Sequence, residues 1–293
     1  MQHFLIITTS LAALSTLPAA AQDTSFQISG ALGAWHNQYG GNGFDARRGI
    51  EGTYDRGAAE LSFSIAAAMD NGLTTVATAH FGYISPAEDG SVEEDDATKS
   101  TADLTLRVMT ERGNLTFGSF AGGGTQDDYG DSDIRMTYGY VGGEVVKNIA
   151  AGTVYAQIGY LNSEDEFKEG PADAPFLNIG GSYNIAEHYA LTGAFSYARG
   201  DTLDLSDNNE LLSLTVGVER SFGDYVVRLD YEATQISFES VSGATFGDTF
   251  GTLSVGASYR FGGTAQHGSL LPKLARWVAY SANEIEQPLD APL

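Results

Sequence analysis

Residues 249–261, "TFGTLSVGASYRF", alternate apolar and small polar side chains with a period of two, which indicates a β-strand with two different faces. One face carries large apolar side chains, and the other carries small polar ones together with Arg260. After residue 21 the chain has no run of about eighteen apolar residues, so we exclude a transmembrane helix. A closed barrel of strands is the other structure that satisfies every backbone group in lipid.

The same division into two faces recurs in residues 176–185, 188–198, 211–219 and 224–234. The polar faces are rich in Gly, Ser and Thr and carry few charges, and Tyr and Phe recur near the strand ends. A soluble β-sandwich also alternates, but its outward face is usually charged and rich in lysine. Aromatic residues at strand ends are typical of membrane barrels. The pattern therefore predicts an all-β, transmembrane antiparallel barrel, with a soluble exported sandwich as an alternative.

The first 21 residues differ from the rest, because an apolar run, "FLIITTSLAALSTL", is followed by Pro18 and a short alanine stretch. This pattern predicts a signal peptide, so that the mature, exported chain begins at Gln22.

The net charge of -23 argues against nucleic acid as a partner, since phosphate binding needs a basic surface. The chain has no cysteine, which excludes disulfides and thiolate metal sites. We expect no cofactor.

Connections between the predicted strands alternate in length. Short turns are predicted at 55–57, 111–114, 148–152, 184–188 and 221–224, and long polar loops at 85–100, 121–133, 162–175, 198–209 and 236–248. This alternation is typical of outer-membrane barrels, whose strands are even in number. About thirteen segments fit the period, so one of the first four is misread, and residues 66–75 are the most ambiguous. We expect about 12 to 14 strands, within a barrel spanning residues 22–263.

Four stretches resemble the Gram-negative outer-membrane general porin family. "FQISGALGAWHNQ", "ARRGIEGTYDRGAAELSFSIAAA" and "LSVGASYRF" are similar to the first, second and last strands of these porins, and "ERGNLTFGSF" to the strand before their third loop. The resemblance implies passive diffusion of small hydrophilic solutes or ions across outer-membrane lipid, often by homotrimers. Two features depart from the family: Phe261 is not terminal, and the loop at 121–133 is short.

Charged residues on the polar faces are the candidate pore-lining residues. They are Arg47, Arg107, Arg135, Arg228, Asp230, Glu232 and Arg260. Opposite them, a loop rich in acids could constrict the pore or attract cations, through Asp127, Asp128, Asp131 and Asp133. A basic wall facing an acidic loop would create a transverse field across the pore. Alternatively, the acids lie on a solvated loop and the arginines pair locally with Glu232, Asp230 or Glu51.

The acidic loops at 85–100, 162–175 and 198–209 either draw cations to the mouth of the barrel or bind divalent ions. The simpler interpretation is that they are solvated loops without a bound ion.

Catalysis is not expected, because neither His80 nor His188 lies in a nucleophile motif. In the tail, 264–293, apolar residues at helical spacing predict an amphipathic helix that lies on the membrane, enters the lumen, binds a periplasmic partner or packs under the barrel. The sequence thus favours a porin-like, cation-favouring channel, with a non-conducting anchor or adhesin as the alternative.

Overall fold

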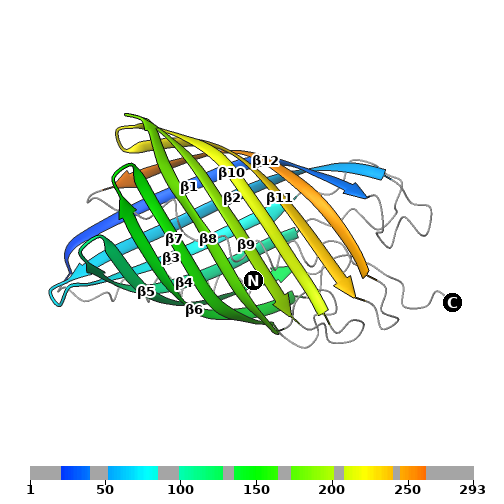
Figure 1. Cartoon of the computed structure of the whole chain (residues 1–293), viewed down its shortest axis with the longest axis horizontal. Coiled ribbons are helices and arrows are strands. Elements are labelled where there is room, and N and C mark those ends of the chain that lie inside the picture. Colours follow the sequence, from blue (N-terminus) through cyan, green and yellow to red (C-terminus); the bar gives the residue numbers. More distant parts are fainter. Residues whose placement is uncertain are drawn as a thin grey trace, which may run out of the picture.

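The computed structural model of the chain describes residues 21–39, 52–84, 99–127, 135–163, 173–200, 208–239 and 245–261. In this part of the chain, twelve strands form a closed antiparallel barrel (Figure 1). The strands are β1 (Ala21–Tyr39), β2 (Gly52–Met69), β3 (Leu73–Ile84), β4 (Lys99–Arg112), β5 (Leu115–Asp127), β6 (Arg135–Ile149), β7 (Gly152–Ser163), β8 (Asp173–Ala186), β9 (Tyr189–Gly200), β10 (Asn208–Phe222), β11 (Tyr225–Glu239) and β12 (Thr245–Phe261).

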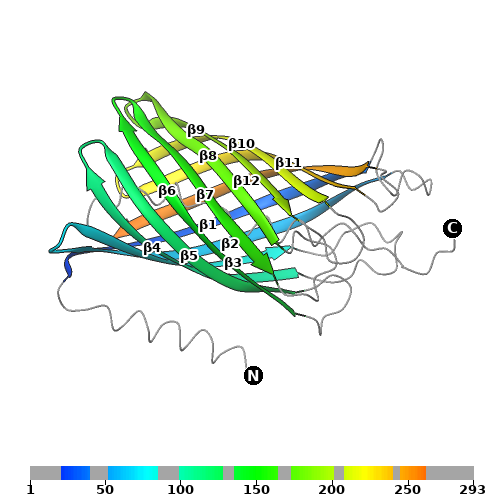
Figure 2. The ribbon, with the colours of Figure 1, turned by 60° about the horizontal axis from the view of Figure 1, so that its bottom comes forward.

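Each strand pairs with its neighbours in sequence, and β1 pairs with β12 to close the barrel. The strands cross the barrel obliquely, as Figure 2 shows. Tilted strands are a geometric requirement for closing a sheet. For twelve strands about 4.8 Å apart and tilted by about 40°, opposite backbones lie roughly 24 Å apart. The prediction of an all-β barrel is confirmed, and the strand number lies at the lower end of the expected range.

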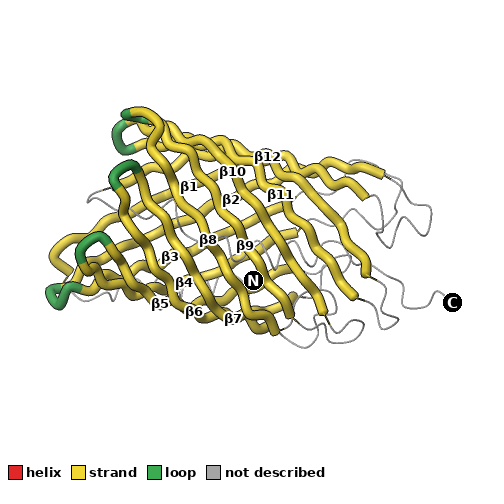
Figure 3. The backbone as a smooth tube through the Cα atoms, in the orientation of Figure 1, coloured by secondary structure: helices red, strands yellow, loops and turns green. Residues whose placement is uncertain are grey.

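Five short turns lie at one end of the barrel, at 70–72, 113–114, 150–151, 187–188 and 223–224 (Figure 3). Gly72, Gly113 and Gly223 have φ of 77°, 67° and 64°, a backbone conformation that glycine adopts without steric cost. Four of the five predicted short turns are confirmed. Short turns on one rim and longer connections on the other are the arrangement of outer-membrane barrels, in which the short turns face the periplasm.

The turn predicted at 55–57 is wrong, because β2 runs without interruption through "DRG" and Gly57 pairs with Ala34 of β1. The ambiguous stretch at 66–75 is instead a hairpin, with β2 ending at Met69 and β3 beginning at Leu73. The loop expected at 121–133 is also shorter than predicted, since residues 121–127 belong to β5. At 55–57 and at 121–127, pairing with a neighbouring strand outweighs the local preference of Gly and Asp for turns.

The outer face of the barrel is apolar. Leu253, Val255, Leu229 and Leu214 are 53%, 55%, 49% and 50% exposed, so these side chains point away from the interior. Such a surface is stable in lipid and would be costly in water. Within the described residues, no helix has the length and apolar character needed to cross a membrane.

Aromatic residues lie on the outer face near both rims. At the short-turn rim, the ring centroids of Tyr225 and Tyr259 are 4.4 Å apart, and those of Tyr259 and Phe261 are 4.3 Å apart. Tyr189 lies at the same rim and Tyr197 near the other end of β9. Eight residues of a strand tilted by about 40° span roughly 21 Å of barrel height, close to the height of the apolar band of membrane barrels.

The predicted signal peptide lies almost wholly in residues 1–20, and the predicted tail helix in residues 264–293. Both stretches are outside the described residues.

Candidate functional site

The barrel interior carries a row of polar side chains that crosses seven strands near their middle. From β5 to β11, each residue of the row is directly opposite the next one on the neighbouring strand, beginning with Gly118 of β5. We call the six residues that have side chains the polar row: Glu144, Gln157, Asn178, Ser196, Ser213 and Thr234. All six side chains are buried. Because the strand period is two, these residues share the inner face with every second neighbour along each strand.

Four members of the polar row form a hydrogen-bond chain that runs in one direction. The Ser196 hydroxyl group donates to Asn178 Oδ1 at 3.0 Å, and Asn178 Nδ2 donates to Gln157 Oε1 at 2.9 Å. Gln157 Nε2 then donates to Glu144 Oε2 at 2.8 Å. Every donor points toward the carboxylate, so the chain stabilises negative charge on Glu144.

Arg107 of β4 balances the negative charge of Glu144 from the side opposite Gln157. Arg107 Nε lies 3.9 Å from Glu144 Oε1, which is an ion pair and not a hydrogen bond. The guanidinium group also lies 5.9 Å from the centre of the Phe120 ring, within range of a cation–π interaction. Arg107 is therefore held against the wall of the barrel, between an acid and an aromatic ring.

A second charged cluster lies on β10 and β11. At the far end of the polar row, Thr234 donates to Ser213, and Ser213 donates to Glu232 Oε1 at 3.0 Å. Further along β11, Arg228 Nε lies 3.1 Å from Asp230 Oδ2. Arg228 therefore pairs with Asp230, one of the acids named in the local-pairing interpretation, whereas Arg107 pairs with Glu144, which that interpretation did not name.

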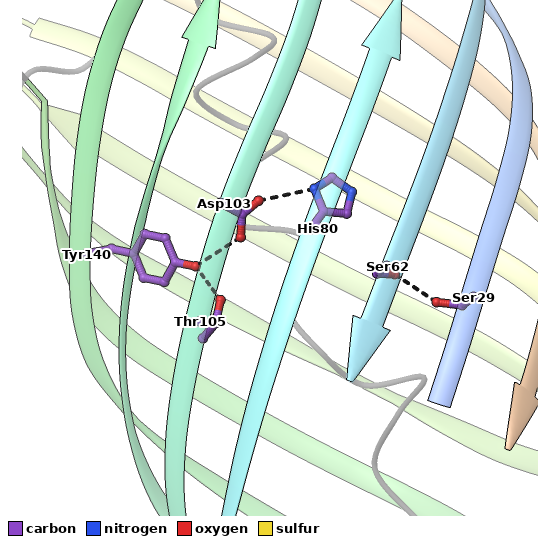
Figure 4. Close-up of polar contacts among 6 residues, drawn as sticks. All are labelled: Ser29, Ser62, His80, Asp103, Thr105 and Tyr140. Atoms are coloured by element: carbon purple, nitrogen blue, oxygen red, sulfur yellow. Dashed lines mark hydrogen bonds and ion pairs between the residues drawn. The ribbon is translucent and has the colours of Figure 1, made fainter. Parts of the chain in front are cut away.

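A third cluster lies on β3, β4 and β6 and is drawn in Figure 4. His80 Nδ1 lies 3.1 Å from Asp103 Oδ2, and the Tyr140 hydroxyl group reaches over β5 toward Asp103 Oδ1, 3.5 Å away. Tyr140 also shares a hydrogen bond with Thr105. His80 is directly opposite Ser62 of β2, whose hydroxyl group is 2.8 Å from that of Ser29. His80 thus belongs to a polar network of the inner wall.

Aromatic side chains on the inner face lie over glycines of neighbouring strands. A Cβ atom at Gly142 would meet the Phe120 ring, and one at Gly159 would meet the Phe176 ring. Their ring centroids are 6.2 Å apart. Glycine gives each ring a place against the backbone, so these large side chains thicken the wall of β5 to β8.

The described inner face carries more acid than base. The carboxylates are Glu60, Asp103, Glu111, Glu144, Glu219, Asp230 and Glu232, and the guanidinium groups whose side chains are described are Arg107 and Arg228. The described residues contain no group of three or more His, Cys, Asp or Glu side chains that could hold a metal ion. The inner wall is therefore acidic and, in this part of the chain, offers no metal centre.

The other predicted site residues are not assembled by the described structure. Arg135 begins β6, Arg260 lies in β12 opposite Gln27, and Asp127 ends β5 opposite Arg135, but their side chains are outside the described set. Arg47, Asp128, Asp131 and Asp133 lie outside the described residues altogether. Glu144 and Asp103 are not among the site residues predicted from the sequence. Both lie on the polar side of a strand with alternating side chains, and this alternation is the signal that identifies them.

A closed antiparallel barrel with an apolar outer face, aromatic residues near both rims and a polar interior is the architecture of bacterial outer-membrane β-barrels, and this chain is a barrel of that class. It is similar in structure to the COG4313 outer membrane channel from Pseudomonas putida F1, with 10% identity and a TM-score of 0.58. The match covers 83% of this chain and 98% of that one.

Two other solved structures are similar at lower TM-scores. The translocator domain of the autotransporter NalP from Neisseria meningitidis has 14% identity and a TM-score of 0.43, covering 88% of this chain and 96% of that one. The KdgM porin has 10% identity and a TM-score of 0.42, and the match covers 79% of this chain and 99% of that one. No model of a known protein family matches the sequence, the general porins included. No curated protein matches it either.

Proposed function

We propose that the barrel is a passive diffusion channel for small hydrophilic solutes or ions and that it favours cations. The observation that carries this proposal is the excess of seven carboxylates over two guanidinium groups on the described inner face. Charges of one sign on the walls of a low-dielectric passage focus the field inside it and raise the local concentration of counter-ions. An acidic lumen therefore attracts cations and repels anions.

Strand number limits the width of the proposed pore. Barrels of about eight strands are filled by their own side chains, whereas those of 16 to 18 strands enclose an aqueous channel. Twelve strands lie between these cases, so we propose a passage narrower than that of a general porin. Similarity to an outer membrane channel is compatible with this function. We further propose, from the resemblance to general porins, that the barrel forms homotrimers, and that it catalyses no reaction and binds no cofactor.

Planar-bilayer recording tests the proposal. The folded protein is added to a bilayer that separates concentrated from dilute KCl, and the conductance and the reversal potential are measured. We expect steady ohmic steps and a reversal potential of the sign given by K⁺ permeation. A triple variant, Asp127→Ala with Asp128→Ala and Asp131→Ala, separates the contribution of the acids at and beyond the end of β5 from that of the carboxylates further inside the barrel. A reversal potential of the opposite sign would contradict the preference for cations.

One observation favours the alternative, a non-conducting barrel that acts as an anchor or adhesin through its acidic loops. Leu211, Gln157 and Thr234 point inward and have less than 2% of their surface exposed. Side chains that line an open passage would keep some contact with water. A purified barrel that shows heat-modifiable gel mobility, and is therefore folded, but gives no conductance would support this alternative and exclude the channel.

A further inference from the structure

Glu144 and Arg107 form an ion pair although a whole strand separates them. Glu144 lies on β6 and Arg107 on β4, and β5 runs between the two strands. On β5 the position directly opposite both Glu144 and Met109 is Gly118. The carboxylate therefore reaches Arg107 by passing over this glycine.

Gly118 has no side chain to block that path. A Cβ atom at 118 would lie 2.8 Å from Glu144 Oε1, 2.9 Å from Glu144 Cγ and 3.1 Å from Met109 Cγ. These separations are shorter than normal contacts, so any larger residue would push the Glu144 side chain away from β5. The φ angle of Gly118 does not require glycine. The steric need comes from Glu144 itself.

The two charges depend on each other. Arg107 and Glu144 are both buried, and Arg107 Nε and Glu144 Oε1 make no hydrogen bond within the described part of the chain. A buried charge that loses its partner is strongly destabilising. Glu144 is anchored from the opposite side by Gln157. Displacing the carboxylate would therefore leave the guanidinium group without compensation beside the lumen.

We infer that Gly118 is a specificity-determining position of the proposed channel, because it lets Glu144 cancel the charge of Arg107 and keeps the lumen acidic. This inference rests on the proposed function. The remaining described carboxylates then set the field, and Arg107 does not act as a basic wall. A side chain at 118 frees Arg107, and a free guanidinium group attracts anions and repels cations.

The test uses six variants in planar bilayers under a KCl gradient. They are Gly118→Ala, Glu144→Gln, Arg107→Gln, the two double variants that add Arg107→Gln to each of the first two, and Gly143→Ala. Gly143 lies on the outer face of β6, and a Cβ atom there would have its nearest neighbour, Gly118 O, at 3.7 Å. We expect Gly118→Ala to lower the K⁺/Cl⁻ permeability ratio about twofold or more, and Gly143→Ala to leave it unchanged.

The dependence on Arg107 distinguishes the inference from a general effect of mutation. Adding Arg107→Gln to Gly118→Ala should remove the fall in the ratio, since no guanidinium group is left to be freed. A fall that persists without Arg107, or no fall in Gly118→Ala, would overturn the inference. A wild-type barrel that is silent would instead overturn the proposed function.

Heat stability gives a second readout if Gly118→Ala does not fold. Glu144→Gln should lower the temperature at which the folded band disappears in heat-modifiability gels. The double variant with Arg107→Gln should recover part of that loss, as expected when the two residues are coupled. Losses that simply add would show that the two charges are independent, which contradicts the inference.

Discussion

Phe26, near the start of β1, is directly opposite Phe261, at the end of β12. This pairing closes the barrel and brings the first and last strands together at the rim of the short turns. Both rings face outward and are about half exposed. The alternation in residues 249–261 therefore ends where the wall of the barrel is complete.

Closure can be tested by a disulfide across the seam, because the chain has no cysteine of its own. Ser29 and Ser258 are directly opposite each other, and opposite residues of antiparallel strands have Cα atoms within disulfide range. The double variant Ser29→Cys with Ser258→Cys should oxidise to an intramolecular disulfide, seen as a mobility shift under denaturing conditions. Ser29→Cys with Ser254→Cys, four residues out of register, should not. Equal oxidation of both pairs would contradict the register.

A charge on the outer face should destabilise the barrel according to its depth. Leu214 lies in the middle of β10 and faces outward, so Leu214→Arg should cost about 2–4 kcal/mol of unfolding free energy in a bilayer. Gln235, exposed near the loop end of β11, is the matched position. Gln235→Arg should cost at most about 1 kcal/mol. Urea unfolding in liposomes measures both, and equal costs would argue against a membrane position.

The two faces of the strands could be predicted from sequence, because the side-chain period of a strand follows from its geometry. Leu253 and Val255 lie outside, and Arg107 and Arg228 lie on the polar side, as the parity of their positions indicates. The clusters could not be predicted. The Glu144–Gln157–Asn178 chain depends on which residues of separate strands are opposite, and register is fixed by the whole barrel and not by any one segment.

The incorrect turn at 55–57 has a similar origin. Asp55, Arg56 and Gly57 have the local preferences of a turn, but each is paired with a residue of β1, and β2 continues through them. By contrast, the predicted turn at 221–224 is confirmed at 223–224, where Gly223 has a positive φ that glycine adopts without steric cost. Local turn preferences are therefore a poor guide where a long neighbouring strand is available to pair with the segment.

Glycine under an aromatic ring should be sensitive to substitution. A Cβ atom at Gly142 would clash with the Phe120 ring and with Ile158 O, whereas one at Gly139, on the outer face of the same strand, would have its nearest neighbour at 3.7 Å. Gly142→Ala should therefore destabilise the barrel by about 1–3 kcal/mol. Gly139→Ala should be close to neutral. Equal stability of the two variants in urea would show that the ring does not pack on Gly142.

Removing the central amide of the polar row should be costly. Gln157 is 1% exposed and bonds both Glu144 and Asn178. Gln157→Leu would leave a buried acceptor and a buried donor unsatisfied, at about 1–3 kcal/mol each. The control is Ile158→Leu, on the outer face of the same strand, which breaks no side-chain hydrogen bond. Chemical unfolding in detergent compares the two, and a stable Gln157→Leu variant would mean that the hydrogen-bond chain contributes little.

The claim that the apolar face of the barrel lies in the membrane is tested most directly by measuring which positions of a strand contact lipid. Single-cysteine variants at positions 252 to 257 of β12 are labelled with a bimane fluorophore, reconstituted, and quenched by brominated lipid. Because the outer face is apolar and the inner face polar, quenching should be strong at 253, 255 and 257 and weak at 252, 254 and 256. Strong quenching at the even positions, or no alternation at all, would contradict a barrel whose apolar face lies in the membrane.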